Sequence, residues 1–203
     1  MSEVAALELN GKRERAKAAN RQAILTAARR VFAQLGYEGA TVRDIIRGTD
    51  LASGTFYNYF RSKEEVFEAL SDDGARRFKP MLRAAREGAD TFEQYLRTAL
   101  RAYFRFLVEE YREEGRPIDE RRPHVRNDTP EMIAVYEEVR RGLEDAISRG
   151  ALPRTDADFL ACACIGMAQE VGAAMMRRTP PKVEEATAFA ADLILHGLNR
   201  ESD

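Results

Sequence analysis

Residues 41–67 constrain the fold more than any other part of the chain, because two short helical patterns, a tight turn and the start of a third helix lie close together there. Thr41 with Asp44, and Ser62 with Glu65, have the spacing of an N-terminal capping box, in which a hydroxyl and a carboxylate satisfy the first free backbone amides. Two helix starts so near each other are typical of a helix-turn-helix.

Between the two caps, the segment GTFYNYF at residues 54–60 has the side chains of a helix that reads DNA. A helix is expected from Ser53 to Phe60, after a turn that follows Asp50. Phe56 and Phe60 are four residues apart and therefore share one face, which we expect to point inward. Hydroxyl, amide and glycine positions remain for the outer face. The alternative for this segment alone is a short aromatic helix that only packs.

Helical periodicity continues along the whole chain, and no alternating strand pattern stands out, so the sequence predicts an all-α protein. The expected helices are residues 21–36, a short helix opened by Thr41, residues 53–60, residues 62–86 with a kink at Pro80, and residues 90–111, 129–150, 155–178 and 183–199. The charged stretch 113–128 contains glycine and two prolines and is predicted as a loop with room for one short helix. About nine helices result.

Charge is distributed unevenly along the chain. Residues 1–63 hold 11 Lys and Arg against 6 Asp and Glu, a net charge of +5, whereas the remaining residues hold 21 against 28, a net charge of −7. A basic N-terminal part on an acidic body favours approach to a polyanion with the N-terminal part first. Residues 1–20 carry four of the basic side chains with little apolar content, and we predict a mobile arm there.

Composition and targeting signals favour a cytoplasmic address. The longest apolar run, residues 159–168, is far shorter than the roughly 18 residues that suggest a membrane span. The N-terminus has neither the apolar region nor the cleavage site of a secretory signal. Cys162 and Cys164 are two residues apart on a predicted helix, so we interpret them as buried thiols, with a redox sensor as the alternative.

The residues carry a resemblance to a known family. The stretch AARRVFAQLGYEGATVRDI, followed by GTFYNYFRSKEEVFEAL, resembles the N-terminal DNA-binding domain of the TetR family of bacterial transcriptional regulators. About fifty residues are covered. Family members commonly have Gly-Val-Ser across the turn, where this chain has Asp50-Leu51-Ala52, and many have Lys or Arg in place of Ser53. Asp50 tolerates a left-handed conformation, whereas Ala52 cannot cap the next helix.

The motif and the resemblance together give the expected division and the expected DNA contacts. We predict a mobile basic arm at residues 1–20, a three-helix helix-turn-helix domain at 21–66, and a larger helical domain for ligand binding and dimerisation at 67–203. The predicted DNA contacts are Thr41, Val42, Arg43, Ser53, Gly54, Thr55, Tyr57, Asn58, Tyr59 and Lys63.

For the C-terminal part, the resemblance implies a cavity for a small, largely apolar inducer and a homodimer. The candidate ligand-binding residues are Tyr103, Phe106, His124, Met132, Tyr136, Met167 and Glu170. The alternatives are an ordinary filled core for the aromatic members, a solvated loop residue for His124, and a surface position or an internal pair for Glu170. The last two helices are rich in small residues and would pair across a two-fold axis; the candidate interface residues are Leu160, Cys164, Met167, Val171, Phe189, Leu193 and Leu198.

The function predicted is a ligand-responsive transcriptional regulator, a repressor that an inducer releases from a palindromic double-stranded operator. An activator, a regulator without ligand, and an adaptor that does not bind DNA are the alternatives. An enzyme is disfavoured, because the chain has two histidines, no P-loop, no HExxH motif and no metal-spaced Cys and His set. We therefore expect no cofactor, no metal and no catalytic residue.

Overall fold

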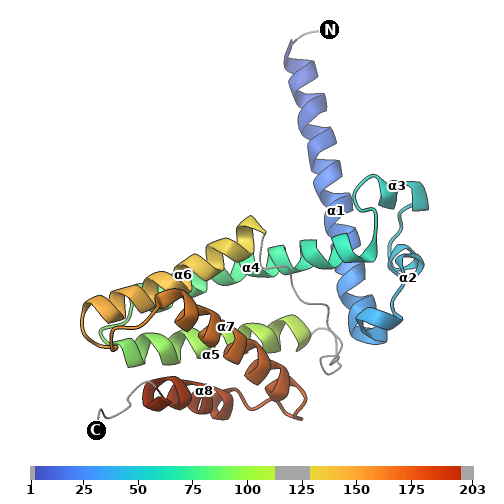
Figure 1. Ribbon diagram of the computed structural model, residues 1–203. Helices are drawn as coiled ribbons and strands as arrows, with labels where there is room; N and C mark the ends of the chain where they lie inside the picture. The colour runs from blue at the N-terminus through green and yellow to red at the C-terminus, as the bar shows by residue number, and fades with distance from the viewer. Residues whose placement is uncertain (1–2, 113–128, 198–203) are drawn as a thin grey trace. The chain divides into compact units, whose positions relative to one another are not determined.

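The computed structural model describes residues 3–112 and 129–197, and the regular secondary structure of this part of the chain is entirely α-helical, as predicted (Figure 1). The helices are α1 (Glu3–Gly39), α2 (Val42–Arg47), α3 (Ser53–Tyr57), α4 (Lys63–Glu87), α5 (Phe92–Arg112), α6 (Pro130–Ser148), α7 (Ala157–Met176) and α8 (Val183–Gly197). The short helix allowed for within residues 113–128 lies outside the described residues. The chain divides into two compact units, with Ser71 at the end of the N-terminal one and Asp72 at the start of the C-terminal one.

Helix α1 begins much earlier than the sequence predicts. It starts at Glu3, so residues that we expected to form an arm are helical, and the predicted start near Arg21 is wrong. These residues have no apolar stripe, but Ala, Lys, Arg and Glu are strong helix formers without one. The predicted stop at Gly36 is confirmed, because its φ of 71° and ψ of 166° interrupt the helical conformation there.

The short helices of the N-terminal unit have the caps that the sequence predicts, with two differences. Thr41 and Asp44 form a complete capping box for α2. The N-cap residue of α3 is Ala52, which makes no side-chain cap, and α3 ends at Tyr57, three residues earlier than expected. No described residue other than glycine has a positive φ, so the turn does not use the left-handed conformation that Asp50 tolerates.

Helix α4 starts in the N-terminal unit and runs without a break through Pro80, and α5 to α8 complete the C-terminal unit. The core of that unit joins Phe78 of α4 and Phe104 of α5 to side chains of α6, α7 and α8. Two glycines allow close approach. A Cβ on Gly142 would lie 2.5 Å from the Tyr95 ring, and one on Gly172 would lie 2.6 Å from Leu107. Thr129 caps α6, as predicted, by accepting the Met132 amide.

Candidate DNA-binding site

The two inward phenylalanines hold α3 in the N-terminal unit, as the sequence predicts. Phe56 is 1% exposed and Phe60 is 4% exposed, and their ring centroids lie 6.1 Å apart. They pack in one core with Ile24 and Leu25 of α1 and with Ile45 of α2. Because these side chains come from three helices, burial of the two rings determines which face of α3 is left outside.

The outer face of α3 carries most of the predicted contact residues. Ser53, Gly54, Tyr57 and Asn58 are exposed, and Thr55 is half-buried. Tyr57 is 58% exposed although it is a large aromatic residue. A Cβ built on Gly54 would meet nothing within 4 Å, so the backbone there is open to close approach by another molecule. This face offers hydroxyl, amide and backbone donors to a base edge or a phosphate.

The start of α2 forms a second edge of the site. The Thr41 hydroxyl accepts the Asp44 amide, and Asp44 Oδ2 accepts the Thr41 amide at 3.1 Å. The side-chain hydrogen bond from Thr41 is the main cause that lowers the pKa of Asp44. Thr41 and Arg43 are exposed and Val42 is half-buried, so the first turn of α2 presents its amide ends and one cation outward.

Lys63, a predicted DNA contact, binds backbone carbonyls within the N-terminal unit. Its Nζ donates to the carbonyl oxygen of Tyr37 at 2.9 Å and to that of Ala40 at 3.2 Å, and it lies 4.5 Å from the Tyr37 ring centroid. Carbonyls at the end of a helix lack intrahelical partners, and a lysine is well suited to bind them. Lys63 therefore joins the start of α4 to the end of α1.

The same corner of the unit contains a buried phenol. Tyr37 is 7% exposed and donates to Glu64 Oε1 at 2.9 Å. Burial, and next the hydrogen bond to Glu64, raise the pKa of Tyr37 to about 12. A hydrogen bond from Ser62 is the main cause that lowers the pKa of Glu64. The corner is thus held by ionic and hydrogen-bonded contacts that involve no residue of the outer face of α3.

Sequence reasoning missed two residues that position the short helices. Asn20 donates from Nδ2 to the Tyr59 hydroxyl at 3.3 Å, which joins the residues that follow α3 to α1. Arg30 donates to the Gly48 carbonyl at 2.9 Å, which ties the end of α2 to α1. Neither residue belongs to an apolar stripe, and both partners are distant in sequence. Tyr59, a predicted contact, is half-buried and engaged in this way.

The predicted ligand-binding residues are only partly brought together. Tyr103, Phe106, Tyr136 and Met167 are half-buried and pack against the C-terminal core. Met132 is half-buried, and His124 lies outside the described residues. Glu170 is exposed on α7, which agrees with the surface alternative for this carboxylate. On an apolar helix, one side remains outside the core, and Glu170 lies on that side.

A surface pocket of about 500 Å³ lies between α4 and α6, and none of the predicted ligand-binding residues lines it. Its walls include the basic side chains of Arg76, Lys79 and Arg83, with Glu87 and Glu131 as the acidic members. Pro80, Ala84, Pro130 and Ala134 complete the lining, so the pocket has both charged and apolar walls. It is not lined by the residues that the sequence analysis selected as ligand-binding candidates.

Two of the residues predicted at a dimer interface are buried within the chain itself. Leu160 and Cys164 are each 8% exposed and belong to the C-terminal core, which contradicts their placement at the surface. They are four residues apart and occupy the inner face of α7. Met167 and Val171 are half-buried, Phe189 and Leu193 are exposed, and Leu198 lies outside the described residues.

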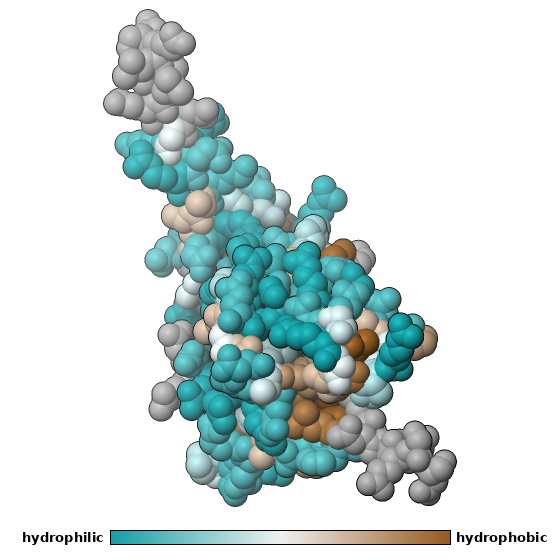
Figure 2. All heavy atoms as spheres, turned by 90° about the vertical axis from the view of Figure 1, so that its left-hand side faces the viewer, coloured by the Kyte–Doolittle hydropathy of each residue, from teal (hydrophilic) through white to brown (hydrophobic). Residues whose placement is uncertain are grey.

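Large apolar side chains nevertheless reach the surface of α7 and α8. Phe159 is 77% exposed, Phe189 is 61% exposed and Leu193 is 52% exposed. Figure 2 shows apolar residues gathered on part of one face of the protein. Among the described helices, α7 alone is long and apolar enough to cross a membrane by composition, and 28% of that apolar window is buried. A soluble monomer seldom exposes so much apolar surface, so these helices have an uncovered face.

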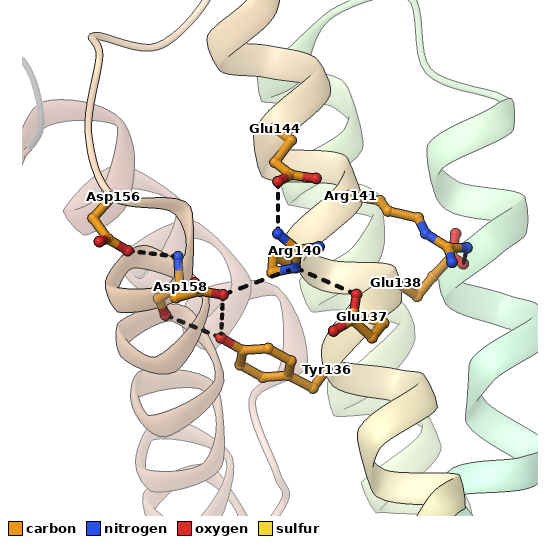
Figure 3. A network of polar contacts seen from close by, with 8 residues as sticks. All are labelled: Tyr136, Glu137, Glu138, Arg140, Arg141, Glu144, Asp156 and Asp158. Atoms are coloured by element: carbon orange, nitrogen blue, oxygen red, sulfur yellow. Dashed lines mark hydrogen bonds and ion pairs between the residues drawn. The ribbon is translucent and has the colours of Figure 1, made fainter.

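Polar contacts connect α6 to both of its neighbours. The close-up in Figure 3 shows Tyr136 and Arg140 directed toward α7, where Asp158 Oδ1 accepts the Tyr136 hydroxyl at 3.0 Å. Burial, followed by the hydrogen bond to Asp158, raises the pKa of Tyr136 to about 12. On another side of α6, Glu138 is 1% exposed and accepts Arg86 Nε of α4 at 2.9 Å. Helix α6 is thus tied to α4 and to α7.

Comparison with known proteins identifies the N-terminal unit. The family model for bacterial regulatory proteins of the tetR family matches residues 24–70, which contain α2, α3 and parts of α1 and α4. The transcriptional repressor AcnR of Corynebacterium efficiens is 47% identical over 58 residues, or 29% of this chain and 31% of that protein. The chain therefore spans about a third of the length of that curated relative.

Solved structures extend the similarity to the C-terminal unit. The TetR family transcriptional regulator PfmR from Thermus thermophilus is 26% identical, with a TM-score of 0.65 over 87% of this chain and 99% of that one. FadR from Bacillus subtilis, solved in complex with stearoyl-CoA, is 19% identical, with a TM-score of 0.69 over 88% of this chain and 99% of that one. Residues 24–70, which contain the complete outer face of α3, thus match the tetR family of bacterial regulatory proteins.

Proposed function

We propose that the chain is a transcriptional repressor that binds a near-palindromic DNA operator as a homodimer and is released by a small effector. The observation that carries this proposal is the outer face of α3, on which Ser53, Gly54, Tyr57 and Asn58 are exposed above the buried Phe56. In a helix-turn-helix, the second helix of the pair enters the major groove, and α3 is that helix here. AcnR, the relative matched over this segment, is a repressor.

The Tyr57→Ala variant tests this assignment. Tyr57 is the large exposed aromatic side chain on the outer face of α3, so its loss should remove a base or phosphate contact. We expect the affinity for a duplex selected by the wild-type chain to fall by about 1–3 kcal/mol, with an unchanged helix content. Fluorescence anisotropy measures the affinity and circular dichroism the fold. An unchanged affinity would remove Tyr57 from the contact surface.

Salt dependence separates a DNA-binding regulator from an adaptor of the same fold. Phosphate contacts release counterions, so the wild-type affinity for duplex DNA should fall steeply as the salt concentration rises. An adaptor would show no such slope. The outward residues Thr41, Val42 and Arg43, at the amide end of α2, are proposed as phosphate contacts, whereas Lys63 is left out because its ammonium group binds backbone carbonyls.

The homodimer is proposed on the exposed apolar face of α7 and α8. Phe159, Phe189 and Leu193 would be covered if these helices paired with their copies about a two-fold axis as a four-helix bundle. Such a dimer also supplies the geometry of the site, since two copies of α3 must lie about 34–36 Å apart to enter successive major grooves. A cytoplasmic protein, rather than one with α7 in a membrane, is the corresponding proposal for its location.

The Phe189→Glu variant tests the interface. Each dimer would place two carboxylates where two aromatic rings are expected to be buried, and burial of one such ring contributes about 1.5–3 kcal/mol. We expect dissociation at least about 100-fold easier than in the wild type, measured by sedimentation equilibrium. Phe189→Leu is the control that keeps an apolar side chain and should remain dimeric. A Phe189→Glu chain that dimerises like the wild type contradicts this interface.

The effector is proposed as a small, largely apolar molecule held among α5, α6 and α7. Tyr103, Phe106, Tyr136 and Met167 are its proposed contacts, since their half-buried side chains come from all three helices. FadR of the same fold was solved with stearoyl-CoA, which has a long apolar chain. An effector that binds one conformation better than another shifts the population of DNA-competent dimers. Thermal shifts with fatty acyl thioesters test this proposal, and no stabilisation by any of them would count against it.

The assignment of functions to the two parts of the chain belongs to the same proposal. Residues 21–66 would form the DNA-binding part, and residues 67–203 would bind the effector and the second subunit. Helix α4 continues from the first unit into the second, so it is the proposed route by which an effector influences α3. No group of three or more His, Cys, Asp or Glu suited to a metal occurs in the described part of the chain, and the proposal requires no metal.

A further inference from the structure

A row of basic side chains runs along one side of α1. Arg13, Lys17 and Arg21 follow one another at intervals of four residues, and all three are exposed. Residues four apart lie on the same side of an α-helix and about 6 Å apart along its axis. We call these three residues the α1 stripe. It spans about 12 Å of helix and belongs to the part of α1 that the sequence had not predicted as helical.

Arg21, the C-terminal residue of the α1 stripe, shows which side of α1 the stripe occupies. Arg21 lies with its guanidinium carbon 5.5 Å from the ring centroid of Phe60, and its neighbour Asn20 binds the Tyr59 hydroxyl. One turn further along, Ile24 is fully buried in the core of the N-terminal unit. The stripe therefore lies on the side of α1 that contacts Tyr59 and Phe60. It extends that side toward the N-terminus, beyond the core. Figure 1 shows that the N-terminal part of α1 projects beyond α3.

Nothing in the described part of the chain uses this extension of α1. Residues 12–19 are all exposed, so they bury no side chain, and no hydrogen bond or ion pair joins Arg13 or Lys17 to a side chain within residues 11–110 or 129–197. A helix that is polar on every side gains little from its own unit. The cations of the stripe are therefore available to a partner outside the chain, and their charge and regular spacing suit a polyanion.

We propose that the α1 stripe is a second DNA contact, which binds backbone phosphates beyond the bases that α3 reads. The proposal rests on the proposed function, because it assumes that α3 binds DNA. The stripe would add affinity that is independent of sequence and strongly dependent on salt, since cations on phosphates release counterions without reading base edges. It would also lengthen the protected stretch of DNA on both sides of the operator.

The opposite side of the same helix provides a matched control. Lys12 and Arg15 are exposed, lie in the same two turns and carry the same charge as Arg13 and Lys17. By helical geometry they point away from the stripe, at about 140–160° from Lys17 around the axis. Arg15 is further engaged by the Gly11 carbonyl at 3.1 Å. Replacement of either pair changes the net charge of the chain by the same amount. The two variants should therefore differ in DNA affinity only if the α1 stripe contacts the DNA directly.

The experiment compares two double variants of the full chain. Arg13→Gln with Lys17→Gln removes the stripe, and Lys12→Gln with Arg15→Gln is the control; glutamine preserves helix propensity. The probe is a duplex selected by the wild-type chain from a random pool, with ten extra base pairs on each side. The dissociation constant is measured from about 50 to 200 mM salt.

The stripe variant should lose about tenfold or more in affinity at the lowest salt, and its salt slope should fall by about 3–4, since four cations per dimer each contribute about 0.9. Its base preference should stay that of the wild type. The control should change the slope by less than about 1. Equal losses in both variants, or no loss in either, would overturn the directed contact while leaving the proposed function intact. A wild-type chain without salt-dependent DNA binding would overturn both.

Discussion

Glu138→Ala should destabilise the C-terminal unit by about 3–5 kcal/mol, which is one of the largest effects we expect of a single substitution in this protein. Glu138 is 1% exposed, and its Oε1 accepts Arg86 Nε at 2.9 Å. Its Oε2 has no hydrogen-bond partner and lies 4.0 Å from Arg83 and 3.8 Å from Arg141. Three guanidinium groups therefore surround one buried carboxylate, and its removal leaves Arg86 with the weaker contact to Asp145 at 3.6 Å.

The adjacent Glu137 is the control for this prediction. It is 39% exposed and pairs with Arg140 at 3.3 Å, so Glu137→Ala should cost less than about 1 kcal/mol. Urea unfolding followed by circular dichroism gives the free energy, and hydrogen exchange assigns the loss to α4 and α6. Equal destabilisation by the two variants would show that the burial of Glu138 does not increase its contribution to the free energy of unfolding. Glu138→Gln, which keeps the shape without the charge, should fall between them.

Phe56→Ala should remove DNA binding by unfolding the N-terminal unit. The ring is 1% exposed and packs with Phe60 in the core that α1, α2 and α3 share. Truncation of a buried phenylalanine costs about 3–5 kcal/mol, a large part of the stability of so small a unit. Hydrogen exchange should therefore rise throughout residues 21–71, whereas the amides of α5 to α8 should keep their protection.

Its neighbour Tyr57 provides the opposite case. Tyr57 is 58% exposed, so Tyr57→Ala should change the stability of the unit by about 0.5 kcal/mol or less while it weakens DNA binding. Two adjacent aromatic residues thus separate folding from recognition. If Phe56→Ala left exchange in the N-terminal unit unchanged, or if Tyr57→Ala raised it, the orientation of α3 described here would be wrong.

Local signals made much of the fold predictable. The cap formed by Thr41 and Asp44, the stop at Gly36 and the Thr129 cap of α6 each depend on residues within one turn of each other, and all three are confirmed. The inward face of α3 was equally predictable, because Phe56 and Phe60 are one turn apart. The extension of α1 could not be predicted from apolar periodicity, because this part of the helix has no apolar stripe.

Contacts between distant residues could not be predicted in the same way. Glu170, the carboxylate that the sequence singled out as a ligand-binding candidate, is exposed, whereas the carboxylate buried among the described residues is Glu138 in a strongly charged stretch. The partner of Glu138, Arg86, is 52 residues away. Lys63 likewise binds carbonyls of residues more than twenty positions earlier. Nothing in the local sequence of either residue reports a partner that only the tertiary fold brings near.

Selection of bound duplexes from a random-sequence pool by the wild-type chain tests whether two copies of α3 read DNA together. We expect enrichment of a near-palindrome whose half-sites are centred about 10 base pairs apart or a multiple of this, as the 34–36 Å spacing of successive major grooves requires. The Tyr57→Ala chain should enrich that sequence less strongly or not at all. A wild-type pool that remains random after repeated selection would show that α3 does not read a DNA sequence.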